Sequence, residues 1–156
     1  MAMAITMREY LRTQDADFEE ITHPREVTAS RVAQQSHVSG EKLAKAVLIK
    51  GDSGYRVLLV PSTCRVNLGG LSSHYHERLG LASENEIHDL FSDCEDGALP
   101  ALAQAYGVRV CYDDMLIDQP DVYLEAGDHE TLVRMSGREF HRLMSQADHG
   151  CISRHM

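Results

Sequence analysis

The chain contains 156 residues, of which 43% are hydrophobic and 25% charged, and its formal net charge is −9. This length suits one domain, and the balanced composition excludes a disordered or fibrous chain. No apolar run approaches the ~18–20 residues that a membrane helix needs, and the first residues lack the pattern of a secretory signal. The four cysteines form no C-x-x-C pair, so we expect free thiols in a cytoplasmic protein with no membrane partner.

The first third of the chain predicts two helices around a short strand. Thr6 and the glutamate three residues later have the spacing of a helix capping box. Residues 17–22 alternate between apolar and polar side chains, which is typical of a strand, and a His-Pro pair ends the alternation. Thr28 is a suitable cap for a second, short and polar helix over about residues 29–37.

The clearest local pattern is a β-hairpin. Lys45–Lys50 and Tyr55–Val60 are two runs rich in β-branched and apolar residues, and Gly51–Gly54 supplies a turn between them. Their nearly continuous apolar character favours central strands that are covered on both faces.

The middle of the chain predicts two capped helices, a third near residues 102–106 and a strand over 108–112. Asn67 is placed to cap the first helix, which we expect to end at Gly80. Ser83, with a glutamate three residues later, predicts the start of the second.

The last third predicts a second hairpin and a final helix. Residues 122–126 and 131–135 flank a Gly-Asp-His-Glu turn, and Ser136 can cap the helix that follows. We expect one domain over residues 1–147 and a frayed C-terminal tail over 148–156. These elements favour an α/β fold of the α+β type, with a mixed, mostly antiparallel sheet flanked by helices.

The charge is unevenly distributed along the chain. Residues 25–70 hold 7 basic and 3 acidic side chains, a net charge of +4, whereas residues 71–156 hold 6 basic and 16 acidic ones, a net charge of −10. The basic segment is either an ordinary solvated face or a patch for one phosphorylated end of a ligand.

Metal, cofactor and nucleophile motifs are missing from the sequence. His74 and His76 fall on a predicted helix, where residues two apart point in different directions and cannot chelate together. There is no H-E-x-x-H, no repeated cysteine pair, no glycine-rich phosphate loop of standard spacing and no G-x-S-x-G. We therefore expect no metal and no cofactor.

Lys45 is the most unusual residue, because it opens an apolar strand. It is either a strand-edge lysine that extends to water or an ammonium held at the mouth of a pocket, where it would bind phosphate or a developing oxyanion. His129 could be a simple turn residue, and residues 97–100 a plain loop.

Four segments in order are similar to the YbaK/prolyl-tRNA-synthetase-associated family. They are LAKAVLIK, GYRVLLVP, DCEDGALPALAQAYGV and YLEAGDHETLVRMS, and the resemblance extends from about His23 to Met144. It implies a curved mixed sheet flanked by helices and hydrolysis of mischarged aminoacyl-tRNA.

The resemblance also implies site residues. Lys45 matches the family lysine that opens a strand, and we take it as the catalytic residue. The family G-x-x-x-P loop aligns with residues 97–101, although Ala101 stands where the family has its final proline. The substrate-binding residues that the resemblance implies are His23, Thr28, Gly97, Ala98, Leu99, Pro100, Ala101 and His129.

Ester hydrolysis at the 3′ end of tRNA needs a placed water or ribose hydroxyl and charge stabilisation, and no protein nucleophile. We expect a deacylase for small aminoacyl groups, with mischarged tRNA and an aminoacyl-tRNA synthetase as partners, acting as a monomer or homodimer. Two alternatives stay open: a non-catalytic binding module of the same fold, and a hydrolase of another small acyl ester. We also expect the loop that contains Ala98 to lie outside the core, so that its enlargement would alter stability little.

Overall fold

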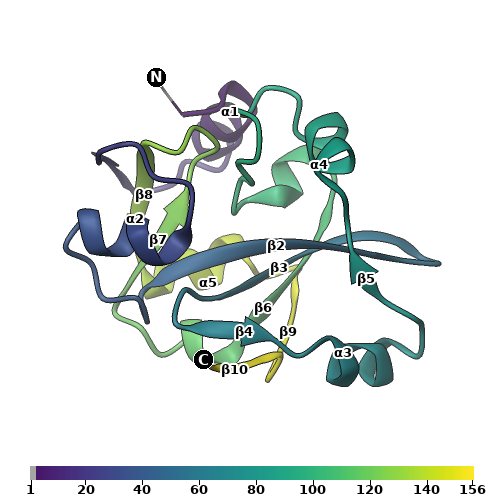
Figure 1. Ribbon diagram of the computed structural model, residues 1–156. Coiled ribbons are helices and arrows are strands. Elements are labelled where there is room, and N and C mark those ends of the chain that lie inside the picture. Colours follow the sequence, from purple (N-terminus) through teal and green to yellow (C-terminus); the bar gives the residue numbers. More distant parts are fainter. Residues whose placement is uncertain (1–2) are drawn as a thin grey trace.

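The computed structural model describes residues 3–156, and the predicted hairpin is at its centre. Strands β2 (Leu43–Gly51) and β3 (Gly54–Pro61) pair antiparallel along their length. Gly51 is the register partner of Gly54, so the turn itself consists of Asp52 and Ser53. This long hairpin crosses the whole molecule (Figure 1).

The hairpin forms the middle of a mixed sheet whose strands follow the order β1-β8-β7-β2-β3-β6-β9, with β5 paired to β2. β7 runs parallel to β2, β6 to β3 and β9 to β6, while the other pairings are antiparallel. The mixed architecture expected from the sequence is confirmed. The remaining strands of this sheet are β1 (Glu19–Thr22), β5 (Gly80–Leu81), β6 (Arg109–Asp113), β7 (Asp121–Glu125), β8 (Thr131–Ser136) and β9 (Asp148–Gly150).

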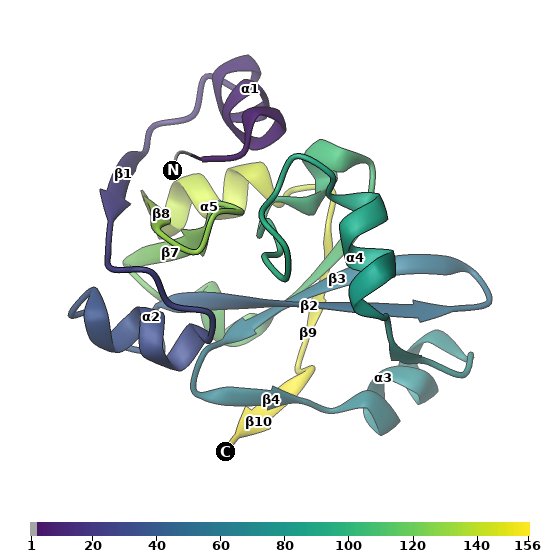
Figure 2. The same cartoon turned by 45° about the horizontal axis from the view of Figure 1, so that its top comes forward.

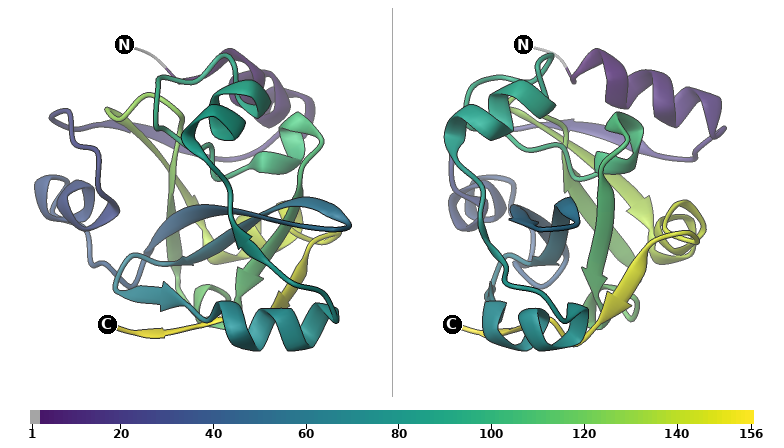
Figure 3. Two further views of the ribbon diagram at one scale, coloured as in Figure 1. Left: turned by 45° about the vertical axis from the view of Figure 1, so that its right-hand side comes forward. Right: turned by 90° about the vertical axis from the view of Figure 1, so that its right-hand side faces the viewer.

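Helices cover both faces of the sheet (Figures 2 and 3). The larger core contains buried side chains from the first and last helices, such as Met7 and Phe140, against Leu48 and Leu124 of the central strands. The opposite face carries two smaller clusters, one beneath the second helix and one beneath the third. The helical elements are α1 (Ile5–Thr13), α2 (Ala29–Gln35), α3 (Leu68–Tyr75), α4 (Glu84–Leu90), α5 (Gly137–Leu143) and the 3-10 turns η1 (Ala103–Tyr106) and η2 (Asp114–Leu116).

Four of the predicted helix caps are confirmed. In each case the side-chain oxygen accepts a hydrogen bond from the backbone N–H three residues later, which satisfies a donor at the exposed helix end. The capping residues are Thr28, Asn67, Ser83 and Ser136.

Two predicted helix ends were wrong. Helix α1 begins at Ile5, and the backbone N–H of Thr6 donates to the carboxylate of Asp93 at 2.8 Å, so a distant residue does the capping. Helix α3 ends at Tyr75 rather than near Gly80, because His76 adopts a left-handed conformation with a φ of 55°. Gly80 belongs to β5.

The expectation of a frayed tail after residue 147 was also wrong. β9 pairs with β6, and β10 (Ser153–His155) pairs with β4 (Cys64–Val66) in a separate two-stranded sheet. The buried carboxylate of Asp113 accepts hydrogen bonds from the Ile152 N–H at 3.1 Å and the Ser153 hydroxyl at 2.7 Å. A buried charge stabilised by these donors holds the tail against the domain.

Candidate functional site

Lys45 lies near the start of β2, where its side chain shares a face of the sheet with Leu43 and the α2 helix. The side chain is partly buried, and its ammonium donates a hydrogen bond of 2.6 Å to the backbone carbonyl oxygen of Cys64. Burial lowers the pKa of Lys45, with a smaller contribution in the same direction from Arg65. Lys45 is therefore a partly desolvated cation held in place by one neutral acceptor.

The Gly97–Ala101 loop is tied to β7 by a backbone hydrogen bond. The N–H of Ala101 donates to the carbonyl oxygen of Glu125 at 3.2 Å. Gly97 has a φ of 77°, a conformation that favours glycine. The side chain of Ala98 is 3% exposed and belongs to the main core, and Pro100 is also buried. The expectation that Ala98 lies outside the core was thus wrong, because the loop packs down onto the sheet.

The turn between β7 and β8 carries His129 against this loop. The carboxylate of Asp128 accepts hydrogen bonds from the N–H groups of Glu130 and Thr131, at 3.1 and 2.8 Å, and from the Thr131 hydroxyl at 2.7 Å. This network holds the turn with His129 at a φ of 61°. The Nε2–H of His129 then donates to the carbonyl oxygen of Asp96 at 2.9 Å. Asp128 was not among the residues expected from the sequence, although an aspartate in a Gly-Asp-His-Glu turn is a typical turn-organising residue.

The segment from His23 to Thr28 lies along the same turn. The backbone N–H of His23 donates to the carbonyl oxygen of Glu130 at 2.8 Å, and that of Glu26 donates to the carbonyl oxygen of His129 at 3.2 Å. Arg25 forms an ion pair with Glu95 in the loop that precedes Gly97. Three segments distant in sequence, which hold most of the predicted binding residues, are therefore directly connected.

Lys45 is connected to this group through the pairing of β2 with β7. β2 and β7 pair only at Leu43 with Tyr123 and at Ala44 with Leu124, after which the Gly97–Ala101 loop takes the place of β2 beside β7. Farther along, β2 pairs with β5 from Ile49 onward. Between these two pairings, from Lys45 onward, this edge of β2 has no strand paired to it.

Glu125 is a residue of this region that sequence reasoning missed. It is the last residue of β7, it is partly buried, and burial raises its pKa to about 7. A glutamate at the end of an alternating strand looks like a surface residue in sequence. Only the pairing of β7 with β2 reveals its position.

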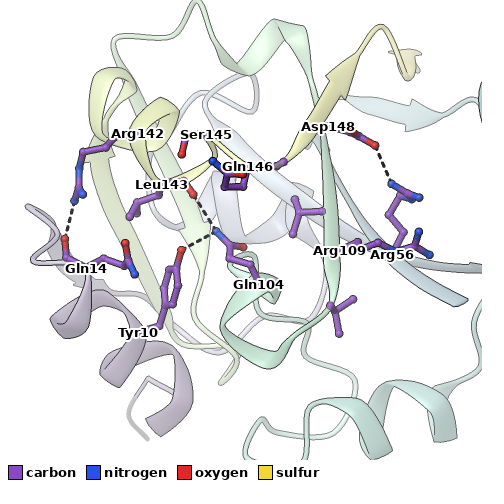
Figure 4. A pocket seen from close by; sticks show the side chains of 13 residues that line it. Tyr10, Gln14, Arg56, Gln104, Arg109, Arg142, Leu143, Ser145, Gln146 and Asp148 are labelled. Carbon is purple, nitrogen blue, oxygen red and sulfur yellow. Dashed lines mark hydrogen bonds and ion pairs between the residues drawn. The ribbon is translucent and has the colours of Figure 1, made fainter.

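A separate cavity of about 470 Å³ lies near the far end of the sheet, and none of the predicted site residues lines it. It is bordered by the guanidinium groups of Arg56, Arg109 and Arg142 (Figure 4). Arg56 is bonded to Asp148, and Arg142 to Glu139 and to the Gln14 carbonyl oxygen. These arginines are held in place by groups of the protein itself.

Cysteine and metal chemistry have little support in the part of the chain that the structure describes. Within residues 3–156, no group of three or more His, Cys, Asp or Glu side chains could hold a metal ion. All four cysteines are free thiols, and burial raises the pKa of Cys94, which precedes the Gly97 loop, to about 11. No helix within those residues is long and apolar enough to cross a membrane.

Comparison with known proteins identifies the family of the chain. A family model described as an aminoacyl-tRNA editing domain matches residues 23–143. The chain belongs to this family. The match begins at His23 and contains Lys45, the Gly97 loop and His129. No curated protein sequence matches the chain.

Solved structures share the fold. A "putative trans-editing enzyme for prolyl tRNA synthetase" superposes with a TM-score of 0.84 at 21% identity, covering 97% of this chain and 96% of the other. The hypothetical protein APE2540 gives 0.84 at 19% identity, with 96% and 99% covered. A "Putative signal transduction protein" from Marinobacter aquaeolei VT8 gives 0.76 at 19% identity, where 97% of this chain corresponds to 31% of that one.

Proposed function

We propose that this protein is an aminoacyl-tRNA deacylase, which hydrolyses the ester bond between a small aminoacyl group and the 3′ end of a mischarged tRNA. The observation that carries the proposal is the position of Lys45 at an unpaired edge of β2, inside the segment that matches the editing-domain family. Within residues 3–156, the sole hydrogen-bond partner of its ammonium is a neutral carbonyl oxygen, so an anionic group of a substrate can compete for it.

Lys45 has two uses in such a reaction. Before the reaction its ammonium attracts the terminal phosphate or ester oxygens. As the ester carbonyl becomes tetrahedral, the same cation stabilises the oxyanion, and its partial desolvation strengthens that interaction. The buried thiol of Cys94, beside the Gly97 loop, is a poor nucleophile because burial raises its pKa to about 11, so the attack on the ester is by a water or involves the ribose hydroxyl.

Two exposed arginines near Lys45 offer a binding surface for the tRNA backbone. Arg65 of β4 and Arg154 of β10 are register partners and both are exposed, and neither guanidinium forms a hydrogen bond or an ion pair within residues 3–156. Like charges directly opposite each other in a ladder are unfavourable, and an anionic backbone would relieve their repulsion. Arg65 follows Cys64, whose carbonyl oxygen binds Lys45.

A panel of mischarged tRNAs tests the proposal. The protein should release alanine and serine from their mischarged tRNAs faster than larger residues, because small pockets discriminate by exclusion. Free alanine and serine ethyl esters, assayed in parallel, separate tRNA-dependent editing from general esterase activity. Binding of the tRNAs without any release of amino acid would instead identify a non-catalytic module.

A further inference from the structure

Glu125 and Lys45 occupy adjacent strands on one face of the sheet. Leu43 pairs with Tyr123 and Ala44 with Leu124, so the next step of this parallel register leads to Lys45 on β2 and Glu125 on β7. Side chains alternate along a strand, so both residues share the face of Leu43 and Tyr123, which pack in the cluster beneath α2. An acidic and a basic side chain therefore flank the point where the two strands separate.

The two charges do not neutralise each other. The ammonium of Lys45 donates to the carbonyl oxygen of Cys64, whereas the carboxylate of Glu125 has no hydrogen bond or ion pair within residues 3–156. On the far side of Glu125, its register partner in β8 is the fully buried Leu132. Arg134, two residues farther along β8, binds Glu19 and Asp121 instead.

A carboxylate in such surroundings is costly, since burial disfavours its charged form unless a cation accompanies it. Burial accordingly raises the pKa of Glu125 to about 7. Glu125 thus has no counter-ion within residues 3–156, although the residue as a whole is not fully buried.

No strand is paired with this side of β2 at Ala46. The carbonyl oxygen of Lys42 accepts from the Tyr123 N–H, and that of Leu48 accepts from the Ala82 N–H, so even-numbered residues of β2 direct their polar backbone groups towards β7 and β5. Ala46 lies between these two contacts and has neither strand beside it. The backbone groups of Ala46 on this side have no strand partner, so they are free to bind a small extended group next to Lys45 and Glu125.

We propose that the Glu125 carboxylate binds the α-ammonium of the aminoacyl group and so selects free aminoacyl esters over acyl esters whose amine is blocked. The inference rests on the proposed deacylase function. In an aminoacyl ester the ammonium is attached to the carbon next to the ester carbonyl. A cation on one side of the entering group and a carboxylate on the other match the charges of a phosphate-linked ester and its amine.

The test uses stable ligands, so that it does not depend on hydrolysis. The probes are 3′-deoxy-3′-(L-alanylamino)adenosine and its N-acetyl derivative, titrated into wild type, Glu125→Gln and a matched control, Glu20→Gln, by NMR at pH 7. Glu20 is an exposed carboxylate on β1. For Glu125→Gln we expect the free-amine probe to bind about 10- to 100-fold more weakly, the range for hydrogen bonds to charged groups, and the N-acetyl probe to bind as in wild type. The control should match wild type with both probes.

Three results would overturn the inference. They are unchanged binding of the free-amine probe by Glu125→Gln, an equal loss for both probes, and no preference of the wild type for the free amine. Hydrolysis of alanyl-tRNA by the same wild-type preparation is measured separately. A protein that binds the free-amine probe through Glu125 but hydrolyses no aminoacyl-tRNA would refute the proposed function and leave this inference standing.

Discussion

The ammonium of Lys45 donates a 2.6 Å hydrogen bond to the backbone carbonyl oxygen of Cys64. This contact links the start of β2 to the start of β4, which continues directly into the exposed side chain of Arg65. The residue proposed to act on the ester and the residue proposed to bind the tRNA backbone are thus connected through one peptide group.

Replacement of both Arg65 and Arg154 with glutamine should weaken tRNA binding without affecting the ester chemistry. Each lost phosphate contact should reduce the slope of log K against log salt by about 1. The measurement is KM for mischarged tRNA at several salt concentrations. Arg138→Gln, at an exposed arginine on α5, serves as the control, and equal salt slopes for all three proteins would show that tRNA binds elsewhere.

Ala98→Leu should destabilise the fold by about 1–3 kcal/mol, because added carbons overfill a packed core at a side chain that is only 3% exposed. Urea unfolding measures the change. Ala105→Leu, at a partly exposed residue of η1, should have a smaller effect. If both variants were as stable as wild type, the loop would not be part of the core.

Asp113→Ala should release the C-terminal strands. It removes the acceptor for the Ile152 N–H and the Ser153 hydroxyl, and hydrogen bonds to a charged group contribute about 1.5–3 kcal/mol each. Limited proteolysis should then cleave after residue 150 in the variant long before wild type. Equal resistance in the two proteins would contradict this role of Asp113.

Glu125→Gln should change how stability depends on pH. Burial raises the pKa of Glu125 from 4.5 to about 7, so the folded state binds the proton more tightly than the unfolded state. The contribution of Glu125 to the free energy of unfolding of the wild type is fully present below pH 4.5, and it is lost as the pH rises towards 7 and above. The glutamine variant should not show this loss. Its free energy of unfolding should therefore rise, relative to that of the wild type, by up to about 3 kcal/mol between pH 4 and pH 8. The measurement is the free energy of unfolding of both proteins as a function of pH. If the two values changed in parallel across this range, the pKa of Glu125 would not be raised in the folded state.

Local sequence patterns predict the parts of this fold that depend on neighbouring residues. The Lys45–Lys50 run with its turn, and the caps at Thr28 and Ser136, each involve residues a few positions apart, so the pattern contains the whole cause. The helix start near Thr6 could not be found in this way, because its cap is Asp93.

The candidate site depends on contacts between distant segments. Lys45 stands out in sequence as a lysine in an apolar strand, but the position of Glu125 follows from the parallel register of β7 with β2. The burial of Ala98 likewise follows from a loop that packs against a strand more than twenty residues later. Contacts of this kind, between segments far apart in the chain, cannot be predicted from local sequence patterns.

The central claim is that Lys45 stabilises the transition state of ester hydrolysis. Single-turnover deacylation of alanyl-tRNA by Lys45→Ala measures this most directly, with Lys50→Ala as the control, because Lys50 is an exposed lysine on the same strand that is bound to Glu86. We expect Lys45→Ala to lose about 2–4 kcal/mol of transition-state stabilisation, roughly 30- to 1000-fold in rate, with an unchanged unfolding temperature, and Lys50→Ala to retain the wild-type rate. Deacylation by Lys45→Ala at the wild-type rate would contradict the account.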